Sequence, residues 1–361
     1  MKRITTMSKI TTIILCCLLA LGMQAACKSK TEETKEATPI KVMLVDGAPL
    51  LSMTAVMSDD FEGIEGYDIE YTITNDSDAL VAALLNKEPD FAIAPINVAA
   101  MMNNNGSGYC LAAVTIWGIM QIVSDRDVST LEDMIGETII AFGRGGTPGI
   151  TLRAVLKQNN IAYNEPDDTN FTPDPDKVNI VYLTAPTDVR DAIATGMVVG
   201  GEAASFGLLA EPVATAITGF AANAGRDGFT PKINLQAEWA KSNNGEVFPQ
   251  AALIFHERLL ADNSGSIVDD FIAYAEQSSI YANERPAEAG DLAVTLGSIS
   301  IPNGKIVEAA YNAGRIQLSF TYAIDAKTAI SNYLQIFMEE NANLIGGKMP
   351  SDSFYYDQSQ S

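Results

Sequence analysis

Residues 141–150, AFGRGGTPGI, are the part of the chain whose composition first suggests a chemistry. Four glycines and a proline lie between an apolar run and a helix-like segment, and glycines let a backbone approach a phosphate closely. A dinucleotide-binding GxGxxG motif counted from Gly143 needs glycine where the chain has Pro148, and the Gly-Lys-Ser/Thr of a P-loop is absent. The spacing therefore excludes both nucleotide motifs. A loop that holds another ligand and a tight strand-to-helix turn both stay open.

Other catalytic and metal-binding patterns are scarce. His256 is the single histidine of the chain, and its apolar context ALIFHERLL is more typical of a structural residue than of a base. CxxC and HExxH spacings are absent. An acidic stretch lacks the glycine and terminal glutamate of an EF-hand and favours a surface loop; it contains Asp167, Asp168, Asp174 and Asp176. The sequence predicts no catalytic residue, no metal site and no cofactor.

Strand-like and helix-like segments alternate in two parts of the chain. Short apolar or alternating runs are typical of strands, and runs with apolar residues at helical spacing follow them. In the first part these segments are IKVMLV, YDIEYTI, ALVAALLNKE and FAIAPIN; in the second they are GETIIAF, ITLRAVLKQNNI, VNIVYL and VRDAIATGM. This alternation predicts an α/β protein with parallel sheets and right-handed crossovers.

Parallel sheets of this kind bind ligands at the carboxyl ends of their strands. The DGAP loop at residues 46–49 and the glycine loop at residues 143–149 both fall at that edge. If the two edges face each other, both loops contact one solute.

A short pattern recurs between the two parts. Thr74, Ser77, Asp78 and Ala82 match Thr184, Thr187, Asp188 and Ala192 at identical spacing. A structural repeat would give this match, and so would helix-capping chemistry alone; both interpretations stay open.

The N-terminal segment is typical of an export signal. Three basic residues precede an apolar run at residues 10–23, which is short for a membrane span, and small residues follow it. Cys27 comes next, so QAAC resembles the lipobox of bacterial lipoproteins, with Gln24 in place of the usual aliphatic residue. We expect a signal at residues 1–26, acylation of Cys27 and a polar tether at residues 27–39. Cys110, in an apolar run, is predicted to be a buried inert thiol.

Length and charge bound the remaining possibilities. The chain has 361 residues, so its folded part exceeds one ordinary core and predicts two lobes. The formal net charge is -22, and removal of the predicted signal, with three basic and no acidic residues, makes it about −25. This charge argues against nucleic acid and anionic lipid surfaces as partners.

Three stretches together resemble a known family. FGRGGTPGITLRAVLKQNNI, GLLAEPVATAI and NLIGGKMPSDSFYY are similar to the solute-binding lipoproteins of ABC importers, in the branch that binds nitrate, sulfonates, taurine and thiamine precursors. The resemblance implies the type II periplasmic-binding-protein fold, with two α/β lobes joined by two crossing strands. It implies a first lobe at residues 40–117 and 248–361 and a second at 118–247. The crossing strands would be VTIWGIMQIVSD and FPQAALIF.

The resemblance also implies where the two lobes hold a solute. The expected ligand-binding residues are Gly47, Ala48, Pro49, Asn75, Ser77, Asn97, Trp117, Gly145, Gly146, Thr147, Thr184 and Glu211. Asn75 and Ser77 could instead only cap a helix, Trp117 could be hinge core, and Glu211 could only favour a helix N-terminus. Asp46 is kept outside this set as a possible cap. Arg144 is the one basic residue in the predicted loops.

The implied function is capture without chemistry. A monomeric lipoprotein outside the cytoplasm, touching the membrane only through its lipid, would bind a small solute, close on it and dock on an ABC permease. Helix N-termini favour a sulfonate-like anion, whereas Trp117 would favour a flat thiamine-precursor-like heterocycle. Two alternatives stay open: an enzyme on the same fold, as in menaquinone or thiamine-pyrimidine synthesis, and a solute sensor.

Overall fold

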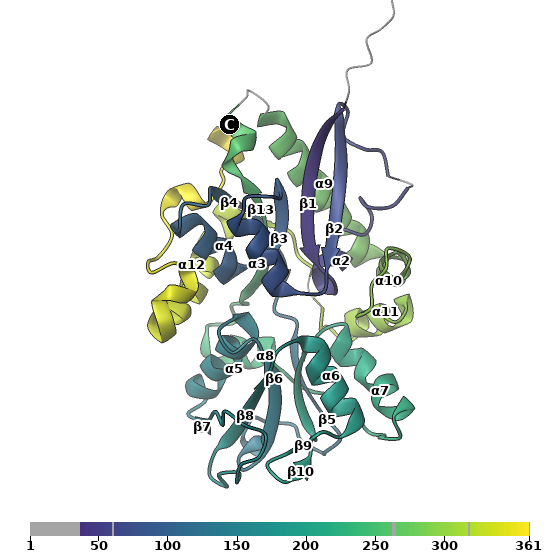
Figure 1. Cartoon of the computed structure of the whole chain (residues 1–361), viewed down its shortest axis with the longest axis vertical. Helices are drawn as coiled ribbons and strands as arrows, with labels where there is room; N and C mark the ends of the chain where they lie inside the picture. Colours follow the sequence, from purple (N-terminus) through teal and green to yellow (C-terminus); the bar gives the residue numbers. More distant parts are fainter. Residues whose placement is uncertain (1–36, 60, 262–264, 317, 361) are drawn as a thin grey trace, which may run out of the picture. The chain divides into compact units, whose positions relative to one another are not determined.

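The computed structural model describes residues 37–59, 61–261, 265–316 and 318–360. The predicted signal, Cys27 and most of the tether lie outside the described residues. The described elements belong to one unit, Thr38–Ser361, and Figure 1 labels them. Within the described residues, no helix has both the length and the apolar character needed to cross a membrane.

The first sheet has six strands in the order β14-β4-β13-β3-β1-β2. Strand β1 is parallel to β2 and β3, and β13 is antiparallel to β3 and β4. The strands are β1 (Thr38–Val45), β2 (Tyr67–Thr74), β3 (Phe91–Pro95), β4 (Tyr109–Trp117), β13 (Pro249–His256) and β14 (Thr321–Tyr322).

The second sheet also has six strands, in the order β12-β5-β11-β6-β8-β7. Strand β6 is parallel to β8 and β11, and β5 is antiparallel to β11 and β12. The strands are β5 (Met120–Ser124), β6 (Thr138–Phe142), β7 (Tyr163–Asn164), β8 (Val178–Leu183), β11 (Phe206–Ala210) and β12 (Thr230–Asn234). A small hairpin pairs β9 (Val198–Val199) with β10 (Glu202–Ala203).

The two sheets follow one plan. In the first sheet β2, β1, β3 and β4 lie in this spatial order, with the antiparallel strand β13 between β3 and β4. In the second sheet β8, β6, β11 and β12 lie in the same order, with the antiparallel strand β5 between β11 and β12. In the first sheet the connecting helices are α2 (Ala48–Leu51), α3 (Ser77–Leu85) and α4 (Ile96–Asn104); in the second they are α5 (Thr147–Gln158), α6 (Pro186–Thr195) and α7 (Val213–Asn223). Of the recurring residues, Thr74 ends β2 and Thr184 follows β8, while Ser77 and Asp78 lie in the first turn of α3 and Thr187 and Asp188 in the first turn of α6.

The remaining helices complete the chain. They are α8 (Leu235–Ser242), α9 (Gly265–Glu284), α10 (Pro286–Thr295), α11 (Gly304–Asn312) and α12 (Ala323–Asn341). Short 3-10 turns lie at η1 (Glu132–Met134), η2 (Glu257–Leu260), η3 (Ala342–Ile345), η4 (Asp352–Phe354) and η5 (Gln358–Gln360).

Burial explains why the central strands read as continuous apolar runs. In β3 the residues from Phe91 to Ala94 are all buried, as parallel strands covered by helices on both faces require. In β1, by contrast, Ile40, Val42 and Leu44 are buried and Lys41 is exposed. This sheet therefore has a fully covered centre and a more open side near β2.

The chain passes between the sheets near Gly118. Strand β4 ends in the first sheet at Trp117 and β5 begins in the second at Met120, as expected for the first crossing strand. The stretch expected to be the second crossing strand, FPQAALIF, forms β13 in the first sheet. Residues 243–248 connect α8, beside the second sheet, to the start of β13. The Gly118 N–H donates to the carbonyl of Phe248 at 3.1 Å, so the two passages lie side by side. The division into lobes at residues 117 and 248 stays a prediction.

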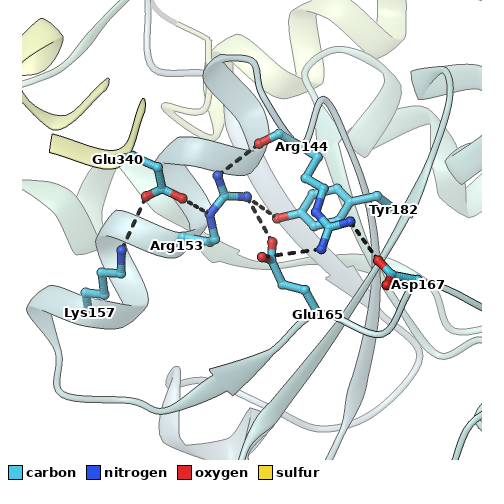
Figure 2. A network of polar contacts seen from close by, with 7 residues as sticks. All are labelled: Arg144, Arg153, Lys157, Glu165, Asp167, Tyr182 and Glu340. Atoms are coloured by element: carbon cyan, nitrogen blue, oxygen red, sulfur yellow. Dashed lines mark hydrogen bonds and ion pairs between the residues drawn. The ribbon is translucent and has the colours of Figure 1, made fainter. Parts of the chain in front are cut away.

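Helix α12 packs against elements of both sheets. The Tyr333 ring stacks on Phe248 with 5.4 Å between ring centroids, and its hydroxyl is 2.6 Å from the Thr151 hydroxyl on α5. Figure 2 shows the polar network beside this contact. In it, buried Arg153 on α5 bonds Glu340 on α12 at 2.7 Å and Glu165 at 3.0 Å. This network fixes α5, and with it the glycine loop at its start, against α12.

We expect Arg153→Met to lower the free energy of unfolding by about 3 kcal/mol, because Glu165 and Glu340 lose their shared buried partner and keep only the more exposed Arg144 and Lys157. The value lies at the low end of the usual range because Glu165 and Glu340 are each 22% exposed. Urea unfolding measures it. Arg285→Met is the matched control: its ion pair with Glu288 is exposed and should contribute about 0.5 kcal/mol or less. Equal losses in the two variants would contradict the assignment.

Candidate functional site

A cavity of about 480 Å³ lies where the carboxyl ends of strands from both sheets meet. Its walls contain residues that follow β1, β2 and β3 of the first sheet and β6, β8 and β11 of the second. This is the edge at which parallel α/β sheets bind ligands. The volume is in the range of small-molecule sites.

Most of the residues expected from the sequence meet in this cavity. Those that line it are Gly47, Ala48, Pro49, Ser77, Asn97, Gly145, Gly146, Thr147, Thr184 and Glu211. Asn75 and Trp117 are not among its lining residues. Whether the ten residues bind a ligand stays a prediction.

The structure gives Trp117 and Asn75 other positions. Trp117 is 6% exposed within the core, and its indole N–H donates to the carbonyl of Ser319 at 2.8 Å. Asn75 is exposed in the loop before α3, whose cap is Asp76: its carboxylate accepts from the Asp78 N–H at 2.8 Å. Strand β4 therefore places Trp117 in the core, which is the alternative that the sequence left open, and its part in ligand binding stays a prediction.

Glu211 lines the cavity with its charge already compensated. It is 1% exposed, and Oε1 accepts from Arg315 Nε at 2.6 Å and from the Thr215 hydroxyl at 3.0 Å. Oε2 accepts from the Thr215 N–H, in the first turn of α7, at 2.9 Å. Burial raises the pKa of this carboxyl, while Arg315 and Thr215 oppose the shift.

Asp46 is compensated in a different way. It is 9% exposed and accepts four hydrogen bonds, from the N–H groups of Gly47, Ile299 and Ser300 and from the Ser298 hydroxyl, at 2.6 to 2.9 Å. It ties the loop after β1 to the segment after α10. Asp46 is therefore a structural acceptor at the wall of the cavity.

Arg190, which sequence reasoning missed, brings a cation to the wall. It lines the cavity from α6; its Nε donates to Asp191 at 2.8 Å, and its guanidinium lies 4.7 Å from the Phe220 ring centroid. In the described part of the chain its two terminal nitrogens have no hydrogen-bond partner. Helical spacing could have revealed it, because Arg190 follows Thr187 by three residues and so shares its face.

Arg144, the cation expected from the loop, points elsewhere. It is exposed, and Figure 2 shows it directed toward Asp167 and Glu165, at 3.1 and 3.6 Å. It is not among the lining residues. Asp167 thus acts as an ion-pair partner of Arg144, and among the described residues no group of acidic, histidine or cysteine side chains has the makings of a metal site.

Three helices begin at the cavity without a side-chain cap. Residues in the first turns of α4, α5 and α6 line it, and the side chains of their N-cap residues Pro95, Gly146 and Ala185 accept no hydrogen bond. Part of each start is already satisfied in α5 and α6: Pro148 and Pro186 have no N–H, the Gly149 N–H donates to the Gly143 carbonyl, and the Asp188 carboxylate accepts the Ala185 N–H at 3.0 Å. Helix α3, whose first turn also lines the cavity, is capped by Asp76. N–H groups at a helix start that lack a partner in the protein need water or a ligand as hydrogen-bond acceptor. The helix dipole favours a negatively charged acceptor there.

The glycine loop serves both as a turn and as part of the wall. Gly143 has a φ of 64°, and its carbonyl accepts the N–H groups of Gly146 at 2.9 Å and Gly149 at 3.1 Å. A Cβ on Gly149 would lie 2.5 Å from that carbonyl oxygen, whereas one on Gly146 would meet nothing closer than 3.7 Å. Gly149 is thus required by the turn, and Gly146 leaves backbone open toward the cavity.

His256 lies outside the cavity lining. It is 7% exposed at the end of β13, and its Nδ1 accepts from the Arg258 N–H at 3.1 Å. Burial, followed by the charges of Arg258 and Lys87, lowers its pKa below 6.5. As predicted from its context, this histidine has a structural position.

Several solved structures have a fold similar to that of this chain. An ABC transporter structure from Parabacteroides distasonis matches with a TM-score of 0.68 and 19% identity, over 89% of this chain and 99% of that one. A Candida albicans gene product with the generic periplasmic binding protein structural fold matches with a TM-score of 0.53 and 13% identity, over 88% and 92%. The chain has the periplasmic binding protein fold. The fold class expected from the sequence is thus confirmed.

One further structure is informative for its ligand. The alkanesulfonate-binding protein of Xanthomonas axonopodis pv. citri, bound to MOPS, matches with a TM-score of 0.59 and 14% identity, over 89% of this chain and 97% of that one. No protein-family model matches the chain, and no curated protein does. At these identities the likeness concerns the fold.

Replacing Gly146 or Gly149 of the loop by alanine should change the free energy of unfolding by different amounts. Gly149→Ala should lower the free energy of unfolding by about 1 to 3 kcal/mol, because its methyl overlaps backbone that cannot move aside. Gly146→Ala should leave it unchanged or raise it by about 0.5 kcal/mol, because its backbone is compatible with alanine. Thermal unfolding compares them, and a loss confined to Gly146→Ala would contradict this division.

Because the chain has one histidine, proton NMR of an untagged protein can follow His256 alone. We expect its folded pKa to lie below 6.5, since burial disfavours the imidazolium. The unfolded state then takes up a proton first, so stability should fall as pH decreases from about 6.5 to the folded pKa. His256→Gln should remove this part of the pH dependence. A folded pKa above 6.5 would reverse the sign and refute the prediction.

Proposed function

We propose that the chain is the solute-binding component of an ABC-type importer and captures a small organic acid in the cavity between its two sheets. The observation that carries this proposal is the convergence of three uncapped helix N-termini on one cavity. Such N-termini place N–H donors and positive potential where an acid group would lie. Solved structures of the same fold that are described as ABC components support the transport role.

An anion agrees with the cavity better than a flat heterocycle does. Trp117 lies in the core, and among the described lining residues the one aromatic side chain is Phe142. Arg190 offers two free guanidinium nitrogens, whereas the charges of Glu211 and Asp46 are already engaged. Binding a cation against Glu211 or Asp46 would require breaking those contacts, and Asp78, the remaining lining carboxylate, is exposed to solvent, so the balance favours a sulfonate, carboxylate or similar acid.

The rest of the wall indicates an apolar body for this acid. Aliphatic side chains from both sheets line the cavity, among them Val45, Val81, Val98, Ile119 and Leu209. Burial of an aliphatic segment against them contributes about 25 cal/mol per Å². The alkanesulfonate-binding protein of the same fold, which also takes an acid on an aliphatic body, supports this inference.

Capture in this proposal involves no chemical step. The solute enters, its acid group satisfies the N–H groups at the helix starts, and the closed form is favoured because only there do residues of both sheets contact the solute. The lipid on Cys27 would keep the monomer at the outer face of the membrane beside its permease. These assignments of anchor, location and partner follow from the sequence and belong to the proposal.

Arg190→Gln should weaken binding of an acidic solute roughly 10-fold to 100-fold, because a charge-assisted hydrogen bond is lost in a site of limited solvent access. Calorimetry with a panel of C2 to C6 alkanesulfonates and alkanoates measures the affinities. Arg285→Gln is the matched control, since this arginine lies outside the cavity lining and is exposed. The panel should include neutral amides of the same length, whose binding should be weaker than that of the acids.

Two results would contradict the proposal. Wild-type protein that binds the neutral amides as well as the acids would refute the role of the helix N-termini. Detection by mass spectrometry of a product formed from a bound acid would favour an enzyme over a carrier.

A further inference from the structure

Phe220, on α7, lies against the cation of the cavity wall. Among the described lining residues Arg190 is the one lysine or arginine, and its guanidinium carbon lies over the Phe220 ring, 4.7 Å from the ring centroid. Phe220 is half-buried and is not itself a lining residue. A guanidinium stacked on an aromatic ring keeps its N–H groups in its own plane, so the contact leaves them available to an acid.

Two contacts together fix the orientation of this guanidinium. The ring covers one face and limits tilting of the plane, while the bond from Nε to Asp191 at 2.8 Å limits rotation within the plane. The edge that remains carries the two terminal nitrogens. Without the ring, the guanidinium would be free to turn this edge toward the Asp191 carboxylate, which is 63% exposed, and so away from an entering acid.

The fold alone does not explain an arginine at this position. Arg190 lies three residues after Thr187, and Leu80 lies three residues after Ser77, the counterpart of Thr187 in the recurring pattern. Leu80 is fully buried, so the corresponding place on α3 holds an ordinary core residue. An arginine at this place on α6 needs apolar cover for its stem and a partner for its charge, and the Phe220 ring supplies a contact of this kind.

Helix α7 holds the ring in place. Val213 in its first turn lines the cavity, and Phe220 follows by seven residues, on the same face of the helix. Buried residues of α6 and α7 share one apolar cluster, and the two helices lie side by side in Figure 1. The start of α7 is fixed at Thr215, whose N–H donates to Glu211 at 2.9 Å and whose hydroxyl accepts from Arg315 at 2.7 Å.

We propose that Phe220 is a positioning residue for acid recognition, whose ring holds the Arg190 guanidinium so that its two terminal nitrogens stay available to the solute. This inference rests on the proposed function and adds to it a residue that does not touch the solute. It implies that the preference for an acid over a neutral solute depends on α7 as well as on α6.

A double-mutant cycle separates positioning from packing. Calorimetry with the panel of alkanesulfonates and alkanoates would compare the wild type, Phe220→Leu, Arg190→Gln and the double variant. We expect Phe220→Leu to weaken binding of the acids roughly 3-fold to 10-fold, as loss of one partly desolvated cation–π contact implies. In the Arg190→Gln background the same substitution should have no further effect, because the group that it positions is gone. Phe220→Tyr keeps the ring and should keep the wild-type affinity.

Phe171→Leu is the matched control, because Phe171 packs against the same apolar cluster as Phe220 whereas the cation contact of Arg190 is with Phe220; it should bind acids as the wild type does. If Phe220→Leu folds poorly, Phe220→Met takes its place in the cycle. Unchanged acid affinity without the ring, or an equal loss with and without Arg190, would overturn the positioning role while leaving the capture of acids intact. A wild type that binds no acid of any kind would overturn the proposed function together with this inference.

Discussion

The arrangement of this protein depends on where its unsatisfied backbone N–H groups are placed. Each parallel strand delivers the chain to a helix that begins at the same edge of its sheet, and every helix starts with N–H groups that lack an intrahelical partner. Here α4, α5 and α6, drawn from both sheets, begin at one cavity with Pro95, Gly146 and Ala185 as caps. A side-chain cap at these positions would engage further donors, so its absence leaves available those N–H groups that backbone carbonyls and Asp188 do not already bind.

The acidic residues of the wall are arranged so that they do not cancel this effect. The Asp46 carboxylate accepts hydrogen bonds from four donors of the protein itself, and the Glu211 carboxylate accepts hydrogen bonds from Arg315 and Thr215. The same bonds tie distant parts of the chain together: the loop after β1 to the segment after α10, and the residue after β11 to the segment after α11. Structure and the proposed selectivity are therefore linked at these two residues, because a solute cation at Asp46 or Glu211 would have to displace bonds that hold the fold.

Much of this could be predicted from the sequence, and the failures have identifiable causes. The alternation of strands and helices predicts which loops share an edge, so ten of the expected residues lie in one cavity. Period-two patterning does not show which side of a fully buried strand faces a cleft, so the sequence leaves both positions of Trp117 open, and the structure places it in the core. The cation expected at the cavity is Arg144, the basic residue of the loops, whereas the structure has Arg190 there. A search confined to loops misses Arg190, because a residue one turn into a helix also faces the cavity. Asn97 lines the cavity as expected, but no local pattern encodes its contact with Leu344, about 250 residues away in sequence.

The strongly acidic composition and the capture of an acid are compatible because they act over different distances. Fields from exposed carboxylates are screened within about 8 Å at physiological ionic strength, so they affect the approach of a solute more than its bound state. Inside the cavity the interactions are short-range, with hydrogen bonds from backbone N–H groups and from Arg190 in a site of limited solvent access. The net charge of -22 therefore describes the surface that keeps the protein solvated and apart from anionic membranes. In the proposed function, the sign of the solute depends on the few groups in the wall that keep hydrogen-bonding capacity, such as the terminal nitrogens of Arg190.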